Sequence, residues 1–281
     1  MKLATLRRDG GTRAARIDTA ADEAVLLPAD DVGALLSSTP DWQATAAEDG
    51  ERVRLDDVEY APVVPNPSKV ICVGLNYRNH ILEMGRDLPQ YPTLFAKVSD
   101  TLIGAYDDIA RPVETEEFDW ECELAVIVGR TVRRADTAAA EQAIAGFAVL
   151  NDITCRDWQF RTREWLQGKN WDATTPLGPW LVTQDEVGGP RPDLAIATTV
   201  DGEVRQQDRT GDLLFDPPML VSYISTMITL RPGDVIATGT PGGVGHARKP
   251  PVYLQPGQRV VTEVEGLGQC DNLVVADEQV R

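Results

Sequence analysis

Short apolar runs, rich in β-branched residues and bounded by turn residues, recur through most of this 281-residue sequence. Runs of this length and composition predict strands. They lie at residues 69–75, 93–98, 122–129, 146–154, 179–183, 194–206, 234–241 and 259–275. The VDGE segment at 200–203 carries the Asp-Gly pair that is typical of a β-hairpin turn. The chain must therefore find a fold that accommodates many strands.

Helices are expected at few places. Apolar residues have helical spacing mainly in residues 77–85, 136–145 and 215–228. Strands and helices do not alternate regularly, so Rossmann and TIM-barrel architectures fit poorly. The 23 glycines and 19 prolines also favour short strands joined by turns. We therefore expect a β-rich α+β fold with a core of the sandwich, roll or barrel type.

The N-terminal part differs from the rest of the sequence. Two short strands around a DGG turn, then a strand and a short helix, are predicted within residues 1–62. Prolines at positions 62, 65 and 67 predict a rigid, extended connector. We therefore expect a small N-terminal domain at residues 1–62 and a larger domain at residues 63–281.

The net charge of the chain restricts the classes of partner that it can bind. With 44 acidic and 27 basic residues, the formal charge is −17, which disfavours nucleic acid and anionic membranes as partners. No apolar run is long enough to span a bilayer, and a signal peptide is not expected. The cysteines at 72, 122, 155 and 270 lack the spacing of a zinc site or a disulfide framework, so we expect a cytoplasmic protein.

Three acidic residues stand at the ends of predicted buried strands. Glu121 and Glu123, at positions i and i+2, point to the same face of a strand. Asp152 ends another apolar run, AGFAVLND, so it too lies at the end of a strand. Adjacent carboxylates repel unless a proton or a cation lies between them, and a hard divalent metal is the simplest compensation. Taken alone, the glutamate pair fits two solvated side chains on an exposed strand face better.

Histidine occurs twice. His80 precedes Glu83 by three residues, so the two share a face if the segment is helical, and a carboxylate beside an imidazole suits a general base. Taken alone, a surface His–Glu pair explains the spacing better. His246, among glycines and basic residues, is interpreted as an ordinary loop residue.

Further polar residues follow Asp152 and the last apolar runs. Arg156 and Gln159 have i, i+3 spacing, and an arginine offers a bidentate fork for a substrate carboxylate. Lys169 is a solvated loop lysine or a point charge near a metal or developing oxyanion. Thr240 begins a glycine-rich turn without the order of a P-loop, and its hydroxyl is a candidate donor to a substrate carboxylate.

Taken together, six segments resemble the fumarylacetoacetate hydrolase family. They are GLNYRNHILEMG, PTLFAKV, FDWECELAVIVG, NDITCRDWQ, GKNWDATTPLGPW and RPGDVIATGTPGGVG, and they follow the family's order over about residues 63–275. The resemblance implies the family's mixed β-sandwich or roll as the catalytic domain, with residues 1–62 as an accessory domain. It also implies a homodimer.

The resemblance assigns roles to the residues in these segments. It implies that Glu121, Glu123 and Asp152 bind the metal, which is Mg²⁺ or Mn²⁺ and in some members Ca²⁺. It implies that His80 and Glu83 form the catalytic dyad on a short lid, and that Lys169 supports the developing negative charge. It further implies that the substrate is bound by Arg156, Gln159 and Thr240.

The resemblance also implies a small anionic 2-oxo acid as substrate. The main hypothesis is a hydrolase that cleaves a C–C bond in an acylpyruvate or fumarylpyruvate through a metal-bound enolate, with His80 activating the water. The same enolate also serves a decarboxylase, or an isomerase or tautomerase, of an oxaloacetate-type or 5-carboxymethyl-2-hydroxymuconate-type diacid. The walls that select the substrate's distal group are expected in loops such as 84–92 and 245–251.

Two non-enzymatic functions are alternatives to the enzyme hypothesis. A metal-binding scaffold with a vestigial site predicts metal affinity without turnover. A sensor of organic acids predicts an output module, and the sequence shows neither a DNA-binding helix pair nor a basic stripe. The complete set of acids, base and metal ligands favours the enzyme.

Overall fold

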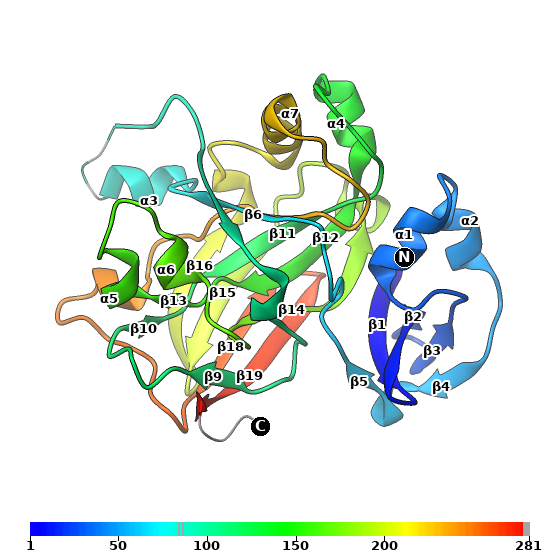
Figure 1. Cartoon of the computed structure of the whole chain (residues 1–281), viewed down its shortest axis with the longest axis horizontal. Coiled ribbons are helices and arrows are strands. Elements are labelled where there is room, and N and C mark those ends of the chain that lie inside the picture. Colours follow the sequence, from blue (N-terminus) through cyan, green and yellow to red (C-terminus); the bar gives the residue numbers. More distant parts are fainter. Residues whose placement is uncertain (84, 86, 278–281) are drawn as a thin grey trace.

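The computed structural model describes residues 1–83, 85 and 87–277. A small group of N-terminal strands and helices lies at one end, beside a larger body built on two sheets (Figure 1). The observed architecture is strand-rich α+β, as the sequence predicts.

The N-terminal part is a small sheet covered by two short helices. Its strands are β1 (Lys2–Arg8), β2 (Gly11–Asp18), β3 (Glu23–Leu26), β4 (Arg52–Arg54) and β5 (Glu59–Tyr60). Its helices are α1 (Val32–Ser38) and α2 (Trp42–Ala47), of which α1 begins where the Asp31 side chain accepts a hydrogen bond from the Ala34 N–H. Strand β1 pairs antiparallel with β14 (Thr175–Thr183), so this sheet continues into the larger body. The boundary at residue 62 stays a prediction.

One long sheet carries the site. Its strand order is β4-β3-β2-β1-β14-β12-β11-β17-β6-β7. The strands of the larger body in this order are β12 (Ile144–Asn151), β11 (Cys122–Val128), β17 (Val235–Ala237), β6 (Val70–Gly74) and β7 (Thr93–Lys97). All residues of β11 and β12 are buried, which explains why both read as continuous apolar runs without alternation.

A second sheet packs against the first. Its strand order is β16-β15-β18-β19-β9. These strands are β16 (Glu203–Arg209), β15 (Ala195–Val200), β18 (Arg259–Val264), β19 (Gly268–Ala276) and β9 (Ile109–Arg111). The predicted hairpin turn joins β15 to β16 with positive φ at Asp201 and Gly202, the conformation that an Asp-Gly turn favours. Ile196, Val264 and Cys270 join the β11 and β12 side chains in one core between the sheets.

Short helices and strands complete the fold. The predicted helices are confirmed as α3 (Arg78–Glu83), α4 (Thr137–Ala143) and α7 (Pro217–Met227), and α4 and α7 are capped by Asp136 and Asp216. The shorter elements are α5 (Arg156–Gln159), α6 (Leu166–Lys169), β8 (Leu102–Ile103), β10 (Phe118–Asp119) and β13 (Thr154–Cys155). The cysteines are free and buried, which agrees with their predicted role as core residues. Among the described residues, no helix is long and apolar enough to cross a membrane.

The contact between β12 and β14 yields a test of the fold. A Cβ atom at Gly146 would lie 2.2 Å from the Val182 carbonyl oxygen on β14. Gly146→Ala is therefore expected to lower the free energy of unfolding by about 1–3 kcal/mol, because the strands must separate. Urea denaturation measures the loss. Gly11→Ala is the matched control, since its new Cβ would meet nothing closer than 3.9 Å. Equal effects of the two substitutions would contradict this account of the packing.

Candidate active site and metal centre

The three acidic residues singled out in the sequence come together. Glu121, Glu123 and Asp152 each offer a carboxylate oxygen, and these oxygens lie within 4.8 Å of one another. The pairing of β11 with β12 explains the convergence, because Cys122 lies opposite Asn151 and the Asp152 N–H donates to the Glu121 carbonyl at 2.8 Å. All three residues are buried, so the alternative of solvated glutamates on an exposed face is wrong.

Buried cations surround the carboxylates. The Lys169 Nζ lies 2.7 Å from both Glu121 Oε2 and Asp152 Oδ2, and the Lys97 Nζ lies 2.8 Å from Asp152 Oδ1. Lys97 also donates to the Lys169 carbonyl oxygen. The Arg156 Nη2 lies 2.6 Å from Glu121 Oε1. Asp152 is thus held between two lysines, and Glu121 between a lysine and an arginine.

The surroundings shift the pKa values of Glu123 and Asp152 in opposite directions. Burial, together with the charges of Asp152 and Glu121, raises the pKa of Glu123 well above its ordinary value. Burial opposes the ionised form of Asp152 as well, but Lys169 and Lys97 outweigh it and lower the pKa of that carboxyl. Burial also disfavours the charged form of Lys169, yet Asp152 and Glu121 raise its pKa above the ordinary lysine value. The cluster therefore has one carboxylate, Glu123, whose negative charge is poorly compensated.

The donor set fits a divalent cation. Three carboxylates from two strand ends supply only oxygen ligands, the chemistry that Mg²⁺, Mn²⁺ and Ca²⁺ prefer. Glu123 is oriented for such a role because its Oε2 accepts a hydrogen bond from the Gly239 N–H at 2.8 Å. A cation beside Glu123 would supply the compensation that the protein's own lysines do not provide.

Asp119 ties Arg156 to the neighbouring loop. The Arg156 Nε donates to Asp119 Oδ2 at 2.9 Å, and the Arg156 Nη1 donates to Gln159 Oε1 at 3.0 Å, as the i, i+3 spacing on α5 allows. Asp119 also accepts from the N–H groups of Gly245 at 2.7 Å and His246 at 3.0 Å. Burial opposes the charge on Arg156, but Glu121 and Asp119 outweigh it and raise the pKa of the guanidinium.

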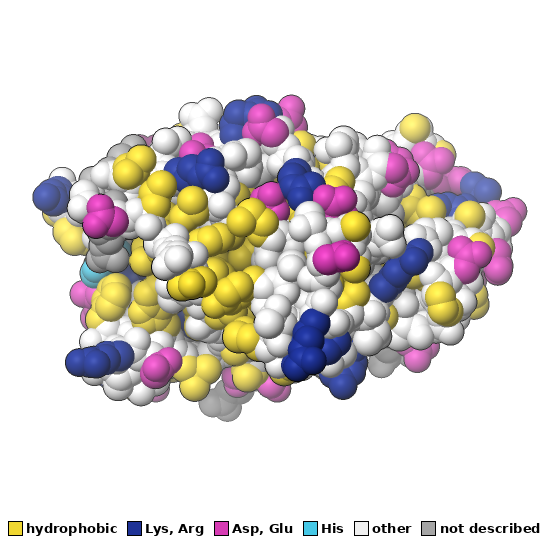
Figure 2. All heavy atoms as spheres, turned by 90° about the horizontal axis from the view of Figure 1, so that it is seen from above, with side chains coloured by type: hydrophobic (Ala, Val, Ile, Leu, Met, Phe, Trp, Pro, Cys, Tyr) yellow, Lys and Arg dark blue, Asp and Glu magenta, His cyan; other side chains and the backbone are white. Residues whose placement is uncertain are grey.

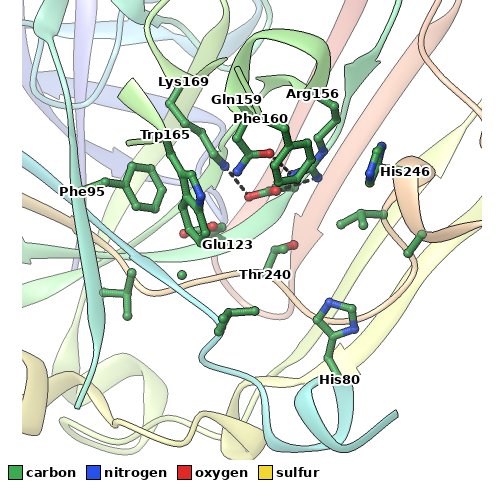
Figure 3. A pocket seen from close by; sticks show the side chains of 16 residues that line it. His80, Phe95, Glu123, Arg156, Gln159, Phe160, Trp165, Lys169, Thr240 and His246 are labelled. Atoms are coloured by element: carbon green, nitrogen blue, oxygen red, sulfur yellow. Dashed lines mark hydrogen bonds and ion pairs between the residues drawn. The ribbon is translucent and has the colours of Figure 1, made fainter. Parts of the chain in front are cut away.

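The cluster forms the floor of a cavity of about 270 Å³. The polar residues that line the cavity are His80, Glu121, Glu123, Arg156, Gln159, Lys169, Thr240 and His246. Phe95, Phe160 and Trp165 are its aromatic lining, with Phe95 and Trp165 in edge-to-face contact at 5.4 Å between ring centroids. Figure 3 shows the dashed contacts of Lys169 and Arg156 on one side of the cavity and His80 on another. A small polar molecule with an apolar stem suits such a space.

His80 reaches the cavity from α3. The helix is anchored at its start by Asn76, whose side-chain amide donates to the Thr238 carbonyl at 2.8 Å, and by Asp212, which accepts from the Asn79 N–H at 2.8 Å. His80 lines the cavity and is therefore placed to meet a ligand. The backbone of Glu83 ends the helix, but its side chain lies outside the described part of the structure, so the predicted dyad stays a prediction.

Thr240 lines the cavity with its hydroxyl already engaged. The Thr240 Oγ1 donates to the Cys122 carbonyl at 2.9 Å and accepts from the Gln206 amide at 2.8 Å. Donation to a substrate carboxylate, as expected from the sequence, would require the hydroxyl to give up its bond to Cys122. The role of Thr240 as a substrate-binding residue stays a prediction.

His246 corrects one reading of the sequence. It lies in a 3₁₀ turn, Gly245–Ala247, and lines the cavity, so the interpretation as an ordinary loop residue is wrong. Its Nδ1 is 2.9 Å from the Tyr253 hydroxyl. A loop whose backbone is held by Asp119 brings the imidazole to the site, and no local periodicity predicts that contact.

Lys97 and Asp119 belong to the site and were not singled out by the sequence. Both are buried charged residues in or beside short strands. The signal for Lys97 is a lysine inside the apolar run TLFAK, where a charge is tolerated only with a partner. Asp119 stands two residues before Glu121 in a similar context, so its signal was present too.

Comparisons with known proteins agree with this geometry. The model of the fumarylacetoacetate (FAA) hydrolase C-terminal family matches residues 69–275. Among curated relatives, oxaloacetate tautomerase Fahd2a, mitochondrial, of Rattus norvegicus is 43% identical over 219 residues, which are 78% of this chain and 70% of that protein.

Solved structures share the whole fold. The fumarylacetoacetate hydrolase of the psychrophilic Exiguobacterium antarcticum is 34% identical, with a TM-score of 0.87 over 98% of this chain and 99% of that one. A 5-carboxymethyl-2-hydroxymuconate delta-isomerase from Mycobacterium smegmatis is also 34% identical, with a TM-score of 0.81 over 98% and 99% of the two chains. The resemblance seen in the six sequence segments is thus confirmed: this chain is an enzyme of the fumarylacetoacetate hydrolase family.

Proposed function

We propose that this enzyme is a divalent-metal-dependent keto–enol tautomerase of a 2-oxo diacid of the oxaloacetate type. The observation that carries the proposal is the cavity itself, in which a buried carboxylate cluster with its lysines meets a histidine from another wall. The similarity to oxaloacetate tautomerases and to a hydroxymuconate isomerase supports this reaction type over the hydrolysis that the sequence analysis put first.

Glu121, Glu123 and Asp152 would hold the metal, with Mg²⁺ or Mn²⁺ as the proposed ion and Ca²⁺ as a further candidate. When bound, such an ion supplies a Lewis acid that polarises the 2-oxo group of the substrate. The carboxylate and 2-oxo oxygens of the substrate are a suitable chelating pair.

The buried cations support an anionic substrate inside an acidic protein. Lys169 is fully enclosed and charged, so its ammonium stabilises negative charge that develops on the 2-oxygen as the enol forms. Gln159 lines the same cavity and carries amide N–H groups that can donate to a carboxylate, and Arg156, which is held by Asp119 and Glu121, adds a positive charge beside it. This local field opposes the formal charge of −17 on the whole chain.

His80 is the proposed proton carrier. In the enol-to-keto direction the 2-hydroxyl gives its proton to solvent and C3 gains one; in the reverse direction C3 loses a proton and the 2-oxygen takes one from solvent. His80, which faces the cavity from α3, exchanges the proton at C3. Tautomerisation needs this proton transfer and no attacking water.

Hydrolysis of a C–C bond is the second candidate. The observation that favours it is the similarity in fold to the fumarylacetoacetate hydrolase of Exiguobacterium antarcticum. In that reaction His80 would deprotonate a water that attacks the distal carbonyl of an acylpyruvate or fumarylpyruvate. Decarboxylation of oxaloacetate would release CO₂ and leave the enolate of pyruvate, which is also the fragment that cleavage of an acylpyruvate leaves.

The keto–enol assay tests the proposal. Oxaloacetate enol is followed by its ultraviolet absorbance with enzyme that has been treated with a chelator and then supplied with Mg²⁺ or Mn²⁺. We expect metal-dependent acceleration of ketonisation, and His80→Gln is expected to lower kcat by about 10²–10⁴-fold, the usual contribution of a general acid–base.

Leu82→Gln is the matched control, because Leu82 lies exposed on the same helix and does not line the cavity. It is expected to retain wild-type turnover. Rapid acylpyruvate cleavage without tautomerisation would overturn the proposal in favour of the hydrolase, and pyruvate formation with loss of CO₂ would favour the decarboxylase.

We also propose that the chain forms a homodimer through the face that carries α7. Met219, Tyr223 and Met227 have i, i+4 spacing and form an exposed apolar stripe on this helix, and the Tyr223 ring contacts that of Tyr91. Figure 2 shows a hydrophobic patch on this side of the molecule. A second copy of the chain is the proposed occupant, in keeping with the expectation from the family resemblance. The cytoplasmic location stays a prediction.

Oligomeric state tests the dimer. Met227→Glu places a charge within the stripe and is expected to shift the sedimentation coefficient from dimer to monomer at micromolar concentration. Val204→Glu is the control, because Val204 is similarly exposed but lies on β16. A monomeric wild-type protein, or a dimer that both variants retain, would contradict the proposal.

A further inference from the structure

His246 has a position that the proposed mechanism leaves unused. Its side chain lines the cavity, is 40% exposed and packs against Phe160 with 5.2 Å between ring centroids. In the view of Figure 3, His246 lies beyond Arg156, on the opposite side of the cavity from Phe95. The imidazole therefore borders the space into which the distal end of a ligand would extend.

The backbone at His246 is fixed by the carboxylate that also holds Arg156. Asp119 accepts hydrogen bonds from the Gly245 and His246 N–H groups and from the Arg156 Nε. A Cβ at Gly245 would lie 1.9 Å from the Val252 carbonyl oxygen, so this turn packs too closely for any other residue. The imidazole and the guanidinium are thus presented to the cavity by one rigid arrangement.

The ring of His246 is oriented by its other neighbours. The Tyr253 hydroxyl lies 2.9 Å from Nδ1, and Glu117 Oε2 lies 3.8 Å from the same atom. Burial and the neighbouring Glu117 carboxylate raise the pKa of Tyr253 to about 12, so its hydroxyl keeps its proton. Because the Tyr253 hydroxyl occupies Nδ1, Nε2 is the ring nitrogen that remains for a ligand, and it is a donor in the tautomer in which Nδ1 accepts from Tyr253.

We propose that His246 binds the second carboxylate of the substrate, and that it sets the preference of the site for dicarboxylates over monocarboxylates. This inference rests on the proposed function for the placement of the 2-oxo acid end at the acidic cluster. The other cations near the cavity are already engaged: Arg156 by Asp119 and Glu121, and Lys169 by Glu121 and Asp152. A carboxylate that enters at the far end meets His246 as its donor.

A pair of unreactive ligands isolates this contact. L-malate and L-lactate share a carboxylate and a 2-hydroxyl, but only malate carries the second carboxylate. Their dissociation constants are measured by calorimetry on the Mn²⁺-supplied protein. His246→Ala is expected to weaken malate binding by about 10-fold or more, the usual loss for a hydrogen bond to a charged group, and to change lactate binding less than about twofold.

Two further variants serve as controls for His246→Ala. His246→Gln keeps an N–H donor at a similar distance and is expected to restore part of the malate affinity. Lys249→Ala removes a positive charge from the same loop at an exposed position outside the cavity lining, and it is expected to leave the ratio of the two affinities within about twofold of wild type. Melting temperatures of all variants show whether the fold is retained.

The results of these binding and activity measurements distinguish the possible roles of His246. Equal weakening of malate and lactate by His246→Ala, or an unchanged ratio, overturns the inference. A large loss of kcat on oxaloacetate with unchanged malate affinity also overturns it and assigns His246 to proton transfer instead. Wild-type protein that prefers malate through His246 yet shows no tautomerisation would refute the proposed function while the carboxylate site stands.

Discussion

The concentration of buried charge at the ends of β11 and β12 is the constraint on which the rest of the structure depends. Glu121, Glu123 and Asp152 are brought together by the antiparallel register of two fully buried strands. Like charges at this spacing in a low-dielectric interior are costly unless they are paired. Lys97 and Lys169 supply part of that pairing, and the remaining demand at Glu123 makes the site suited to a divalent ion.

The need of the buried carboxylates for positively charged partners also fixes the segments around them. Lys97 reaches Asp152 from β7, and Lys169 from α6, so strands and helices distant in sequence are fixed around one carboxylate. On the other side, Asp119 joins Arg156 to the turn at Gly245–Ala247. The cavity is therefore walled by segments that are each tied to the charged cluster, while α3 brings His80 from outside it.

Much of this arrangement could be predicted from the sequence, for identifiable reasons. The strands at 122–128 and 144–151 are continuous apolar runs, and the acids at their ends follow from that pattern. Local spacing also predicts the contact of Arg156 with Gln159 on one helical turn. The convergence of Asp152 with the glutamates, by contrast, depends on strand register, which periodicity does not determine.

The residues that were missed share one property. Lys97, Asp119 and His246 act through contacts with segments far along the chain, and no local pattern marks such partners. Charged residues within apolar runs, as at Lys97, are the available signal, because burial requires a partner of opposite charge. Local spacing also does not decide between hydrolysis and tautomerisation, because a histidine placed as a base serves both reactions. The similarity to known tautomerases and isomerases is what favours tautomerisation.

Anomalous diffraction from crystals grown with Mn²⁺ tests the central claim most directly. The account predicts one strong peak among the carboxylates of Glu121, Glu123 and Asp152, at distances of about 2.0–2.4 Å from their oxygens. It also predicts that the peak disappears in Glu123→Gln, the variant of the least compensated ligand. Manganese bound elsewhere on the chain, with the three carboxylates turned only toward Lys97, Lys169 and Arg156, would contradict it.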